Sequence, residues 1–239
     1  MISIIIPTLN EESVIERTLR SLKRLALPHE IIVSDGKSTD KTIEISRTLA
    51  DKVVVYAGSA RQTIAMGRND GARAAKGDFL VFMDADAETL EPDTFFKHAL
   101  EHFANDPKLV ALTARLRVLP EHETWSDRLI FGMLTFNLRM LNNVFHRGES
   151  TGELQMMRRE TFDAVDGFNE SLVTREDGDM FLRLSKIGRT MLDPHLTVYH
   201  TGRRAHTIGW PRLLWTWMLN TVWFAIFKRA KSREWTVIR

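Results

Sequence analysis

The sequence predicts an α/β protein in which helices flank a mostly parallel central sheet. Short runs of apolar, often β-branched residues alternate with segments whose apolar residues recur at helical spacing. This alternation indicates parallel strands joined through helices by right-handed crossovers. The run at 79–83 lacks the polar alternation of a half-exposed strand and is therefore expected at the centre of the sheet. With 239 residues, 44% of them hydrophobic, the chain is long enough for a substantial core.

The expected elements follow from these patterns in chain order. An isoleucine-rich run at 2–6 forms the first strand, which Pro7 ends. Thr8 and Asn10, residue types that favour helix N-caps, are expected to open a helix whose buried face carries residues such as Leu19. The later elements are a strand at 30–35, a helix from Lys41, a strand at 53–55, a small-residue helix at 60–75, the strand at 79–83, a helix at 125–145 and a strand at 155–159.

Asp84 and Asp86 directly follow the central strand and are the first candidate ligand-binding residues. In open α/β sheets, ligands bind at the carboxyl ends of the strands. Side chains at i and i+2 of an extended segment point the same way, so both carboxylates could bind one hard cation such as Mg²⁺ or Mn²⁺. Asp-x-Asp is also common in surface turns, and the pair alone leaves both interpretations open.

Polar residues also follow the second strand. Asp35 ends that strand, where it could accept hydrogen bonds from a ribose or a base, and Ser38 is a preferred helix cap. Arg68 lies on the small-residue helix and is a candidate for phosphate or base contact, with a solvated arginine as the alternative.

Five sequence blocks, taken in order, carry a more specific signal. They are IIIPTLNEE at 4–12, IIVSDGKSTD at 31–40, GRNDGARAAKGD at 67–78, DAD at 84–86 and REDGDMFLRL at 175–184. Together they resemble the successive signatures of the family 2 inverting glycosyltransferases, over roughly residues 2–200. Ser34 stands where many members have an acidic residue, and Lys37 stands where a small residue is common. Neither departure removes a required function.

This resemblance implies a GT-A fold, with a nucleotide-binding half at about 1–88 and an acceptor and catalytic half at 89–205. The implied metal ligand is Asp86, and Asp84 would lie near the ribose. His200 is a further candidate for binding metal or phosphate, because members of the family often carry a histidine after the final strand, with a structural role as the alternative. The residues implied to hold the nucleotide are Pro7, Thr8, Glu11, Asp35, Arg68 and Asp84.

The implied reaction transfers a sugar from a UDP- or GDP-linked donor to an acceptor hydroxyl or a lipid phosphate, with inversion and with Mn²⁺ or Mg²⁺. A base must take the proton of the incoming hydroxyl. Asp177, near the start of an expected helix, is the candidate catalytic base, with Glu176 and Asp179 as its nearest alternatives. Repulsion within this acidic cluster raises a pKa toward the useful range.

Two other functional classes fit these residues less well. A sugar nucleotidyltransferase would need a glycine-rich basic loop after the first strand, where this chain has PTLNE at 7–11. A membrane-surface binding module with a vestigial nucleotide site would have lost its acidic residues, and these are present.

Residues 206–239 are expected to form a basic, tryptophan-rich appendage. From residue 203 onward, eight basic residues and the single acidic Glu234 give +7 in a chain whose formal net charge is +2. The apolar stretch at 213–227 is shorter than the roughly 20 residues that span a bilayer. This composition favours an amphipathic helix lying on an anionic membrane surface through 210–233. Docking on the body, or on a second subunit of a homo-oligomer, is the alternative.

Other features narrow the expected partners and location. Because the basic residues flank a tryptophan-rich apolar helix, nucleic-acid binding is not expected. The absence of cysteine and of a signal-peptide pattern favours a cytoplasmic protein, peripheral at the inner face of a membrane. The broad apolar arc of the helix at 125–145 favours core packing over a lipid-facing or acceptor-gating role.

Overall fold

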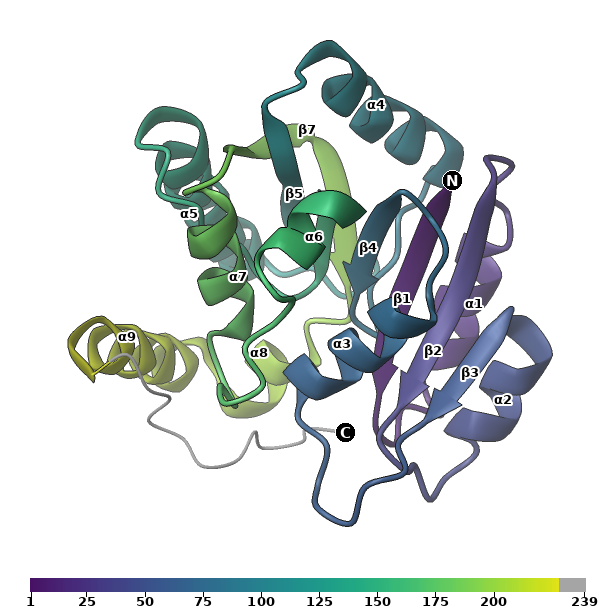
Figure 1. The fold of residues 1–239 in the computed structure, drawn as a ribbon. Helices are drawn as coiled ribbons and strands as arrows, with labels where there is room; N and C mark the ends of the chain where they lie inside the picture. Colours follow the sequence, from purple (N-terminus) through teal and green to yellow (C-terminus); the bar gives the residue numbers. More distant parts are fainter. Residues whose placement is uncertain (228–239) are drawn as a thin grey trace.

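Residues 1–227, which the computed structural model describes, are built around a seven-stranded sheet of order β3-β2-β1-β4-β6-β5-β7 (Figure 1). Within these residues β6 alone runs antiparallel, between β4 and β5. The predicted α/β class with a mostly parallel sheet is therefore confirmed. The strands are β1 (Ile2–Thr8), β2 (His29–Asp35), β3 (Lys52–Val55), β4 (Phe79–Met83), β5 (Leu109–Val118), β6 (Leu154–Arg158) and β7 (Arg189–His200).

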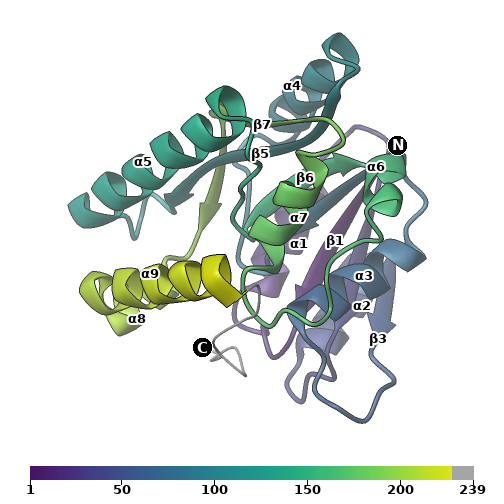
Figure 2. The same ribbon diagram turned by 60° about the vertical axis from the view of Figure 1, so that its left-hand side comes forward.

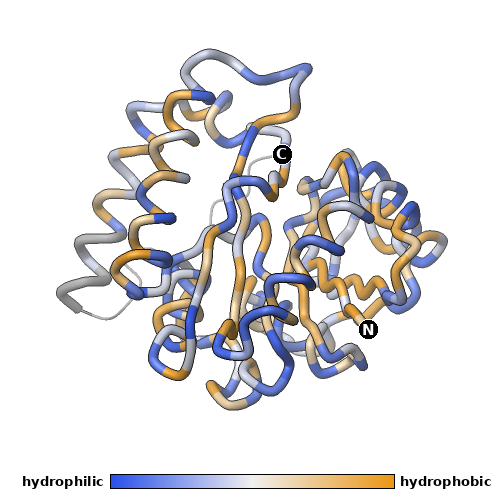
Figure 3. The backbone as a smooth tube through the Cα atoms, turned by 90° about the horizontal axis from the view of Figure 1, so that it is seen from above, coloured by the Kyte–Doolittle hydropathy of each residue, from blue (hydrophilic) through white to orange (hydrophobic). Residues whose placement is uncertain are grey.

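Helices cover both faces of this sheet. Ile4 and Ile6 of β1 pack in one hydrophobic cluster with α1 and α4, whereas Ile5 packs in a second cluster with α3 and α7. Hydrophobic colour accordingly follows β1 from the N-terminus in Figure 3. A strand buried on both faces needs apolar residues at every position, which explains the unbroken apolar runs. The helices are α1 (Ile15–Leu22), α2 (Thr42–Leu49), α3 (Ile64–Ala74), α4 (Pro92–Asn105), α5 (Trp125–Arg139), the π-helical turn η1 (Met140–Val144), α6 (Arg159–Ala164), α7 (Glu176–Leu184), α8 (Arg203–Ile208) and α9 (Trp210–Phe227).

Helix α1 begins at Ile15, later than the sequence predicts, and no side chain caps it. Thr8 Oγ1 instead donates to Asp35 Oδ2 at 2.8 Å, and Asn10 Oδ1 accepts the Thr39 N–H at 2.8 Å. The predicted capping roles of Thr8 and Asn10 are wrong, because both side chains tie the β1 loop to the β2 loop. These two loops are thereby fixed at one edge of the sheet.

Helix α5 packs on the sheet with one side only. Phe131 and Leu138 are buried, as core packing predicts. Leu129, Met133 and Phe136, which the same prediction placed in the core, are exposed. The prediction of core packing is therefore wrong for Leu129, Met133 and Phe136. No described part of the chain covers their side chains.

Helix α9 begins beside α5 and, in the view of Figure 2, runs below α5 from the left-hand side toward the middle of the molecule. Trp210 Nε1 donates to Asp127 Oδ1 at 2.8 Å, and the Trp210 ring lies 5.1 Å from the Phe131 ring. None of the helices described within residues 1–227 combines the length and the apolar character needed to cross a bilayer. The predicted basic cluster at 228–233 lies outside the described residues.

Candidate active site

The loops after β1 and β2 are held together by a buried carboxylate. Thr8 and Asp35 are register partners at the carboxyl ends of their strands. Asp35 accepts hydrogen bonds from Thr8 Oγ1 at 2.8 Å, from Ser38 N–H at 2.7 Å and from Ser38 Oγ at 2.6 Å. Ser38 therefore supports Asp35. Pro7 and Thr8, at the end of β1, and Asp35 line the same edge, as the resemblance implies.

Arg68 is buried beside this edge and is not a solvated arginine. Its Nη1 donates to Glu176 Oε1 at 3.1 Å, and its Nη2 donates to the Gly152 carbonyl at 3.2 Å and to Asp84 Oδ1 at 3.4 Å. Its side chain is only 1% exposed, and its guanidinium lies over the Phe168 ring at 5.1 Å. Burial opposes its charge, yet the carboxylates of Glu176 and Asp84 raise its pKa overall. Arg68 thus joins the segments after β4, before β6 and at the start of α7.

Asp84 and Asp86 turn toward different partners. The chain bends between them, with the Ala87 N–H donated to the Asp84 carbonyl at 3.1 Å. Asp84 contacts Arg68, whereas Asp86 Oδ2 accepts the Thr201 hydroxyl at 2.5 Å. The strand ends at Met83, so the rule that side chains at i and i+2 of an extended segment point the same way does not apply to this pair.

Gly152 lies where three functional groups converge. A Cβ atom at this position would lie 2.8 Å from Arg68 Nη2, 3.6 Å from Asp84 Oδ2 and 3.8 Å from Asp177 Oδ2. A methyl group there would press against the guanidinium, so the position needs glycine. Asp84, on the β4 side, and Asp177, on α7, therefore both lie close to Gly152 and to Arg68.

The three acidic residues of α7 have different surroundings. Glu176 is buried against Arg68, and burial, followed by repulsion from Asp177, raises its pKa to about 7. Asp179 is paired with Arg183 at 2.7 Å. Asp177 is half-buried, contacts the Gly178 N–H at 2.8 Å and forms no ion pair with any residue in the described part of the chain. Asp177 is therefore the acid that remains open to a ligand.

Arg203 joins two of the predicted site residues, Glu11 and Asp86. Its Nη1 lies 2.7 Å from Glu11 Oε2, and its Nε lies 3.4 Å from Asp86 Oδ2. Burial raises the pKa of Glu11, although Arg203 opposes the shift. Sequence reasoning gave Arg203 no individual role in the site. It serves here as the counter-charge of both carboxylates.

His200 ends β7 close to Asp86. Its Nδ1 accepts the Gly202 N–H at 3.2 Å, and its Nε2 is buried with no hydrogen-bond partner among the described residues. Burial lowers the pKa of His200, so the ring is neutral at pH 7, and the charge of Asp86 only partly opposes this shift. Because Nδ1 accepts the Gly202 N–H, the neutral ring carries its proton on Nε2. A divalent cation could bind Nε2 only in the other tautomer, in which the hydrogen bond from Gly202 to Nδ1 is given up.

The loop before β6 contributes two acids that sequence reasoning did not identify. Glu153 has a buried Oε2 without a hydrogen-bond partner in the described part of the chain, and burial, followed by repulsion from Asp84, raises its pKa to about 8. Glu149 is paired with Arg175 at 2.7 Å. The sequence contains no spacing signal for these acids. They reach the site through the pairing of β6 with β4.

Replacing Glu153 with glutamine is expected to stabilise the protein at alkaline pH only. The folded-state pKa of about 8 lies above the ordinary value of 4.5, so folding favours the protonated form. The stability that protonation provides is complete below pH 4.5 and is lost as the pH rises through 8. Glutamine keeps the uncharged form at every pH. The melting temperature at pH 9 should rise by about 2–4 °C for each 1 kcal/mol recovered, with little change at pH 5.

Glu160→Gln provides the control in these melting experiments. Glu160 is an exposed glutamate on α6. A Glu153→Gln shift of equal size at pH 5 and pH 9 would contradict the assigned pKa.

Comparison with known proteins places this geometry in a family. The model of Glycosyl transferase family 2 matches residues 3–166. The chain belongs to this family. It is 30% identical over 219 residues to the succinoglycan biosynthesis protein ExoA of Rhizobium meliloti (strain 1021), with 87% of this chain and 65% of that protein covered.

A second relative and a solved structure extend the comparison. The second relative is a dolichyl N-acetyl-alpha-D-glucosaminyl phosphate 3-beta-D-2,3-diacetamido-2,3-dideoxy-beta-D-glucuronosyltransferase of Methanococcus voltae, 33% identical, with 51% of this chain and 40% of that protein covered. The chain thus spans less than two thirds of either relative. The mannosyltransferase PcManGT from Pyrobaculum calidifontis, in complex with GDP-Man and Mn²⁺, superposes with a TM-score of 0.67 at 24% identity, covering 84% of this chain and 56% of that one.

These comparisons settle the family, the GT-A-type fold and the class of protein. The predicted family and GT-A-type fold are confirmed, and the chain belongs to a family of enzymes, the family 2 glycosyltransferases.

Proposed function

We propose that this glycosyltransferase moves a sugar from a UDP- or GDP-linked donor to an acceptor hydroxyl or a lipid phosphate, with inversion. The observation that carries the proposal is the convergence of Arg68, Asp84 and Asp177 around Gly152. Arg68 offers a positive charge suited to phosphate, Asp84 a carboxylate suited to ribose hydroxyls, and Asp177 a carboxylate with no ion pair among the described residues. They meet at the carboxyl edge of the sheet, where α/β proteins bind ligands.

The proposed donor site lies mainly in the half at about 1–88. Asp35, held by Thr8 and Ser38, contributes a carboxylate of fixed orientation at the end of β2. Pro7 and Glu11 flank it, and Arg68 and Asp84 continue the site toward the diphosphate and the ribose. The half at 89–205 contributes Asp177 from α7 and the segment before β6. Residues 206–239 form the proposed appendage.

Asp86 and His200 would hold a divalent cation, Mn²⁺ or Mg²⁺. Such a cation neutralises the charge that develops on the departing diphosphate. The assignment rests on the carboxylate of Asp86 and on the buried imidazole of His200, whose Nε2 would bind the cation in the tautomer that gives up the Gly202 hydrogen bond. PcManGT was solved with Mn²⁺, which is consistent with this assignment. Arg203 holds the same Asp86 oxygen, so it competes with the cation for that carboxylate.

Asp177 is the proposed general base. Its carboxylate accepts the proton of the acceptor hydroxyl while that oxygen attacks the anomeric carbon from the face opposite the diphosphate, so the configuration inverts. Glu176, paired with Arg68, positions that arginine and the start of α7. Glu176 therefore acts through its neighbour and supports the catalytic group.

Binding of the donor can be tested with nucleotides and metal. The melting temperature of the protein should be measured with UDP, GDP and their sugar conjugates in the presence of Mn²⁺. It should rise with the nucleotides of one base, either uracil or guanine. Asp86→Asn should lose the Mn²⁺-dependent part of the rise, because the amide has no charge for the cation, and should keep the metal-independent part. Failure of every nucleotide to shift the wild-type protein, or an unchanged Mn²⁺ dependence in Asp86→Asn, would contradict this part of the proposal.

A lipid surface is the proposed location of the acceptor. Trp125, Leu129, Met133 and Phe136 form an exposed apolar stripe on α5, with Trp125 76% and Phe136 67% exposed. Trp215 and Met218 are exposed on α9, which joins α5 through Trp210. Apolar aromatic surface followed in sequence by a basic cluster is typical of helices that lie on anionic bilayers. The Methanococcus voltae relative, whose name specifies a dolichyl N-acetyl-alpha-D-glucosaminyl phosphate, supports the same proposal.

Membrane contact is expected to depend on this stripe. The protein should co-sediment with vesicles containing anionic lipid and much less with purely zwitterionic ones. Phe136→Asp should weaken the binding at least tenfold, because a charge at the apolar boundary opposes insertion. Ile187→Asp, which changes an exposed apolar residue outside α5 and α9, is the control. Equal binding of both variants would contradict this orientation.

A further inference from the structure

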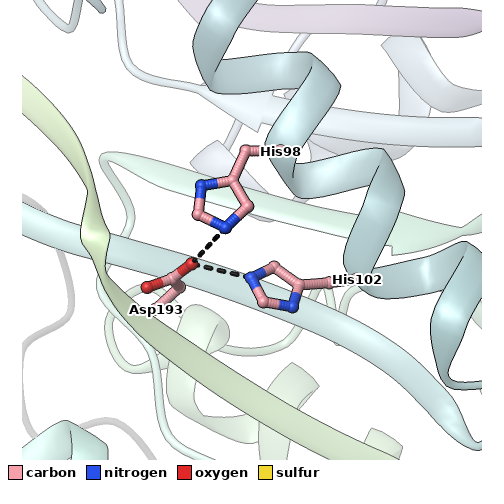
Figure 4. A group of neighbouring side chains, drawn as sticks. All are labelled: His98, His102 and Asp193. Carbon is pink, nitrogen blue, oxygen red and sulfur yellow. Dashed lines mark hydrogen bonds and ion pairs between the residues drawn. The ribbon is translucent and has the colours of Figure 1, made fainter.

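Three metal-binding side chains converge on α4 and β7, outside the candidate active site. His98 and His102 lie one turn apart on the same face of α4, and Asp193 lies on β7 (Figure 4). The Asp193 Oδ2 atom is 2.7 Å from His102 Nε2 and 3.5 Å from His98 Nε2. One ligand atom from each residue lies within 4.8 Å of the others. Both imidazoles thus point at the same carboxylate oxygen.

The hydrogen bonds between these groups do not account for the arrangement. The contact of His102 is a well-formed hydrogen bond, whereas the 3.5 Å contact of His98 is too long for one. The two rings stack at 4.8 Å, so the second imidazole adds no good bond to the carboxylate. The other Asp193 oxygen is used, because Oδ1 accepts the His195 N–H at 2.8 Å. A cation would bind all three lone-pair donors at once.

The donor set selects the kind of cation. Two imidazole nitrogens and one carboxylate oxygen suit zinc and its neighbours among the transition metals, whereas Mg²⁺ and Ca²⁺ prefer oxygen ligands. Tetrahedral zinc places its ligand atoms about 3.3 Å apart, so small rotamer changes close the present arrangement. Asp193 is 4% exposed, whereas the side chains of His98 and His102 are 40% and 29% exposed. A cation can therefore enter from the histidine side.

We propose that His98, His102 and Asp193 form a zinc-class metal site distinct from the donor site. Asp193 pairs with Ala114 of β5, whereas His200 pairs with Val118, which separates them by about 13 Å along the sheet at 3.3 Å per residue. Asp193 also lies at the register shift that interrupts the pairing of β7 with β5. The bound cation fastens α4 to β7 at this irregular point.

Titration of metal-free protein with Zn²⁺ against a chromophoric chelator tests the site. One equivalent should bind with micromolar or tighter affinity and raise the melting temperature. His98→Ala and His102→Ala should each weaken binding at least tenfold. His102→Gln keeps a donor for Asp193 while removing the imidazole, so it should retain the fold and still lose zinc. Substitution of Co²⁺ should give visible absorption bands of a tetrahedral site.

Two controls separate this site from other histidines and from the donor site. His122→Ala, a change at an exposed histidine outside the cluster, should bind zinc like the wild type. Asp86→Asn should also bind one equivalent of Zn²⁺. Wild-type protein that binds no zinc at 100 µM, or folded His98→Ala and His102→Gln variants that bind it unchanged, would overturn the proposal.

Discussion

Replacing Asp177 with asparagine is expected to lower kcat for sugar transfer by about 10²–10⁴-fold, the usual contribution of a general base. The amide keeps the size of the side chain and the contact with the Gly178 N–H but cannot accept the proton. Donor affinity should change little, because the implied nucleotide contacts lie elsewhere. Transfer rates and donor binding, measured on the same preparation, test both statements.

Asp179→Asn is the matched control for this experiment. It makes the same chemical change two residues away, at a carboxylate committed to Arg183 at 2.7 Å. It should cost a little stability and leave kcat within a fewfold of the wild type. A folded Asp177→Asn protein with full activity would exclude Asp177 as the base and direct attention to Glu176, whose pKa is raised to about 7.

Replacing Arg68 with methionine is expected to give the largest loss of stability, about 3–5 kcal/mol. Methionine fills much of the volume but leaves Glu176 buried without its counter-charge, and the Gly152 carbonyl loses its donor. For a chain of this size, such a loss lowers the melting temperature by about 10 °C. Calorimetry or denaturant unfolding measures the change.

Two further variants separate the buried charge from general effects. Arg68→Met combined with Glu176→Gln should recover part of the stability, because no unpaired charge then remains in the interior. Arg73→Met, on the same helix but 65% exposed and paired with Asp70, should cost about 0.5 kcal/mol or less. A single Arg68→Met variant as stable as Arg73→Met would show that the buried pair contributes little.

The sequence predicts most strands because burial on both faces produces unbroken apolar runs. It failed where a polar residue had two possible partners. Thr8 and Asn10 have the chemistry of helix caps, yet they bind Asp35 and Thr39 across the edge of the sheet. Local propensity favours a helix-capping role for these residue types. Only the register of β1 with β2 shows that Thr8 lies opposite Asp35, which competes for its hydroxyl.

Some residues of the candidate site could likewise be predicted from the sequence, and others could not. Arg68, Asp84 and Asp177 stand in blocks whose order is readable in the sequence, and the fold brings them together at Gly152. Glu153 and Arg203 stand outside any repeating pattern. Their roles follow from burial and from the pairing of distant strands, which no spacing rule encodes.

The antiparallel strand β6 determines when the open edge of β4 is covered during synthesis. Strands β1 to β4 can pair as soon as they leave the ribosome, but Met83 pairs with Leu154, which follows 71 residues later. At about 5–20 residues per second, β4 waits on the order of 4–14 s with one apolar edge open to misassociation. Gly152 and Glu153 directly precede β6, so the strand that closes this edge also brings them into the active site.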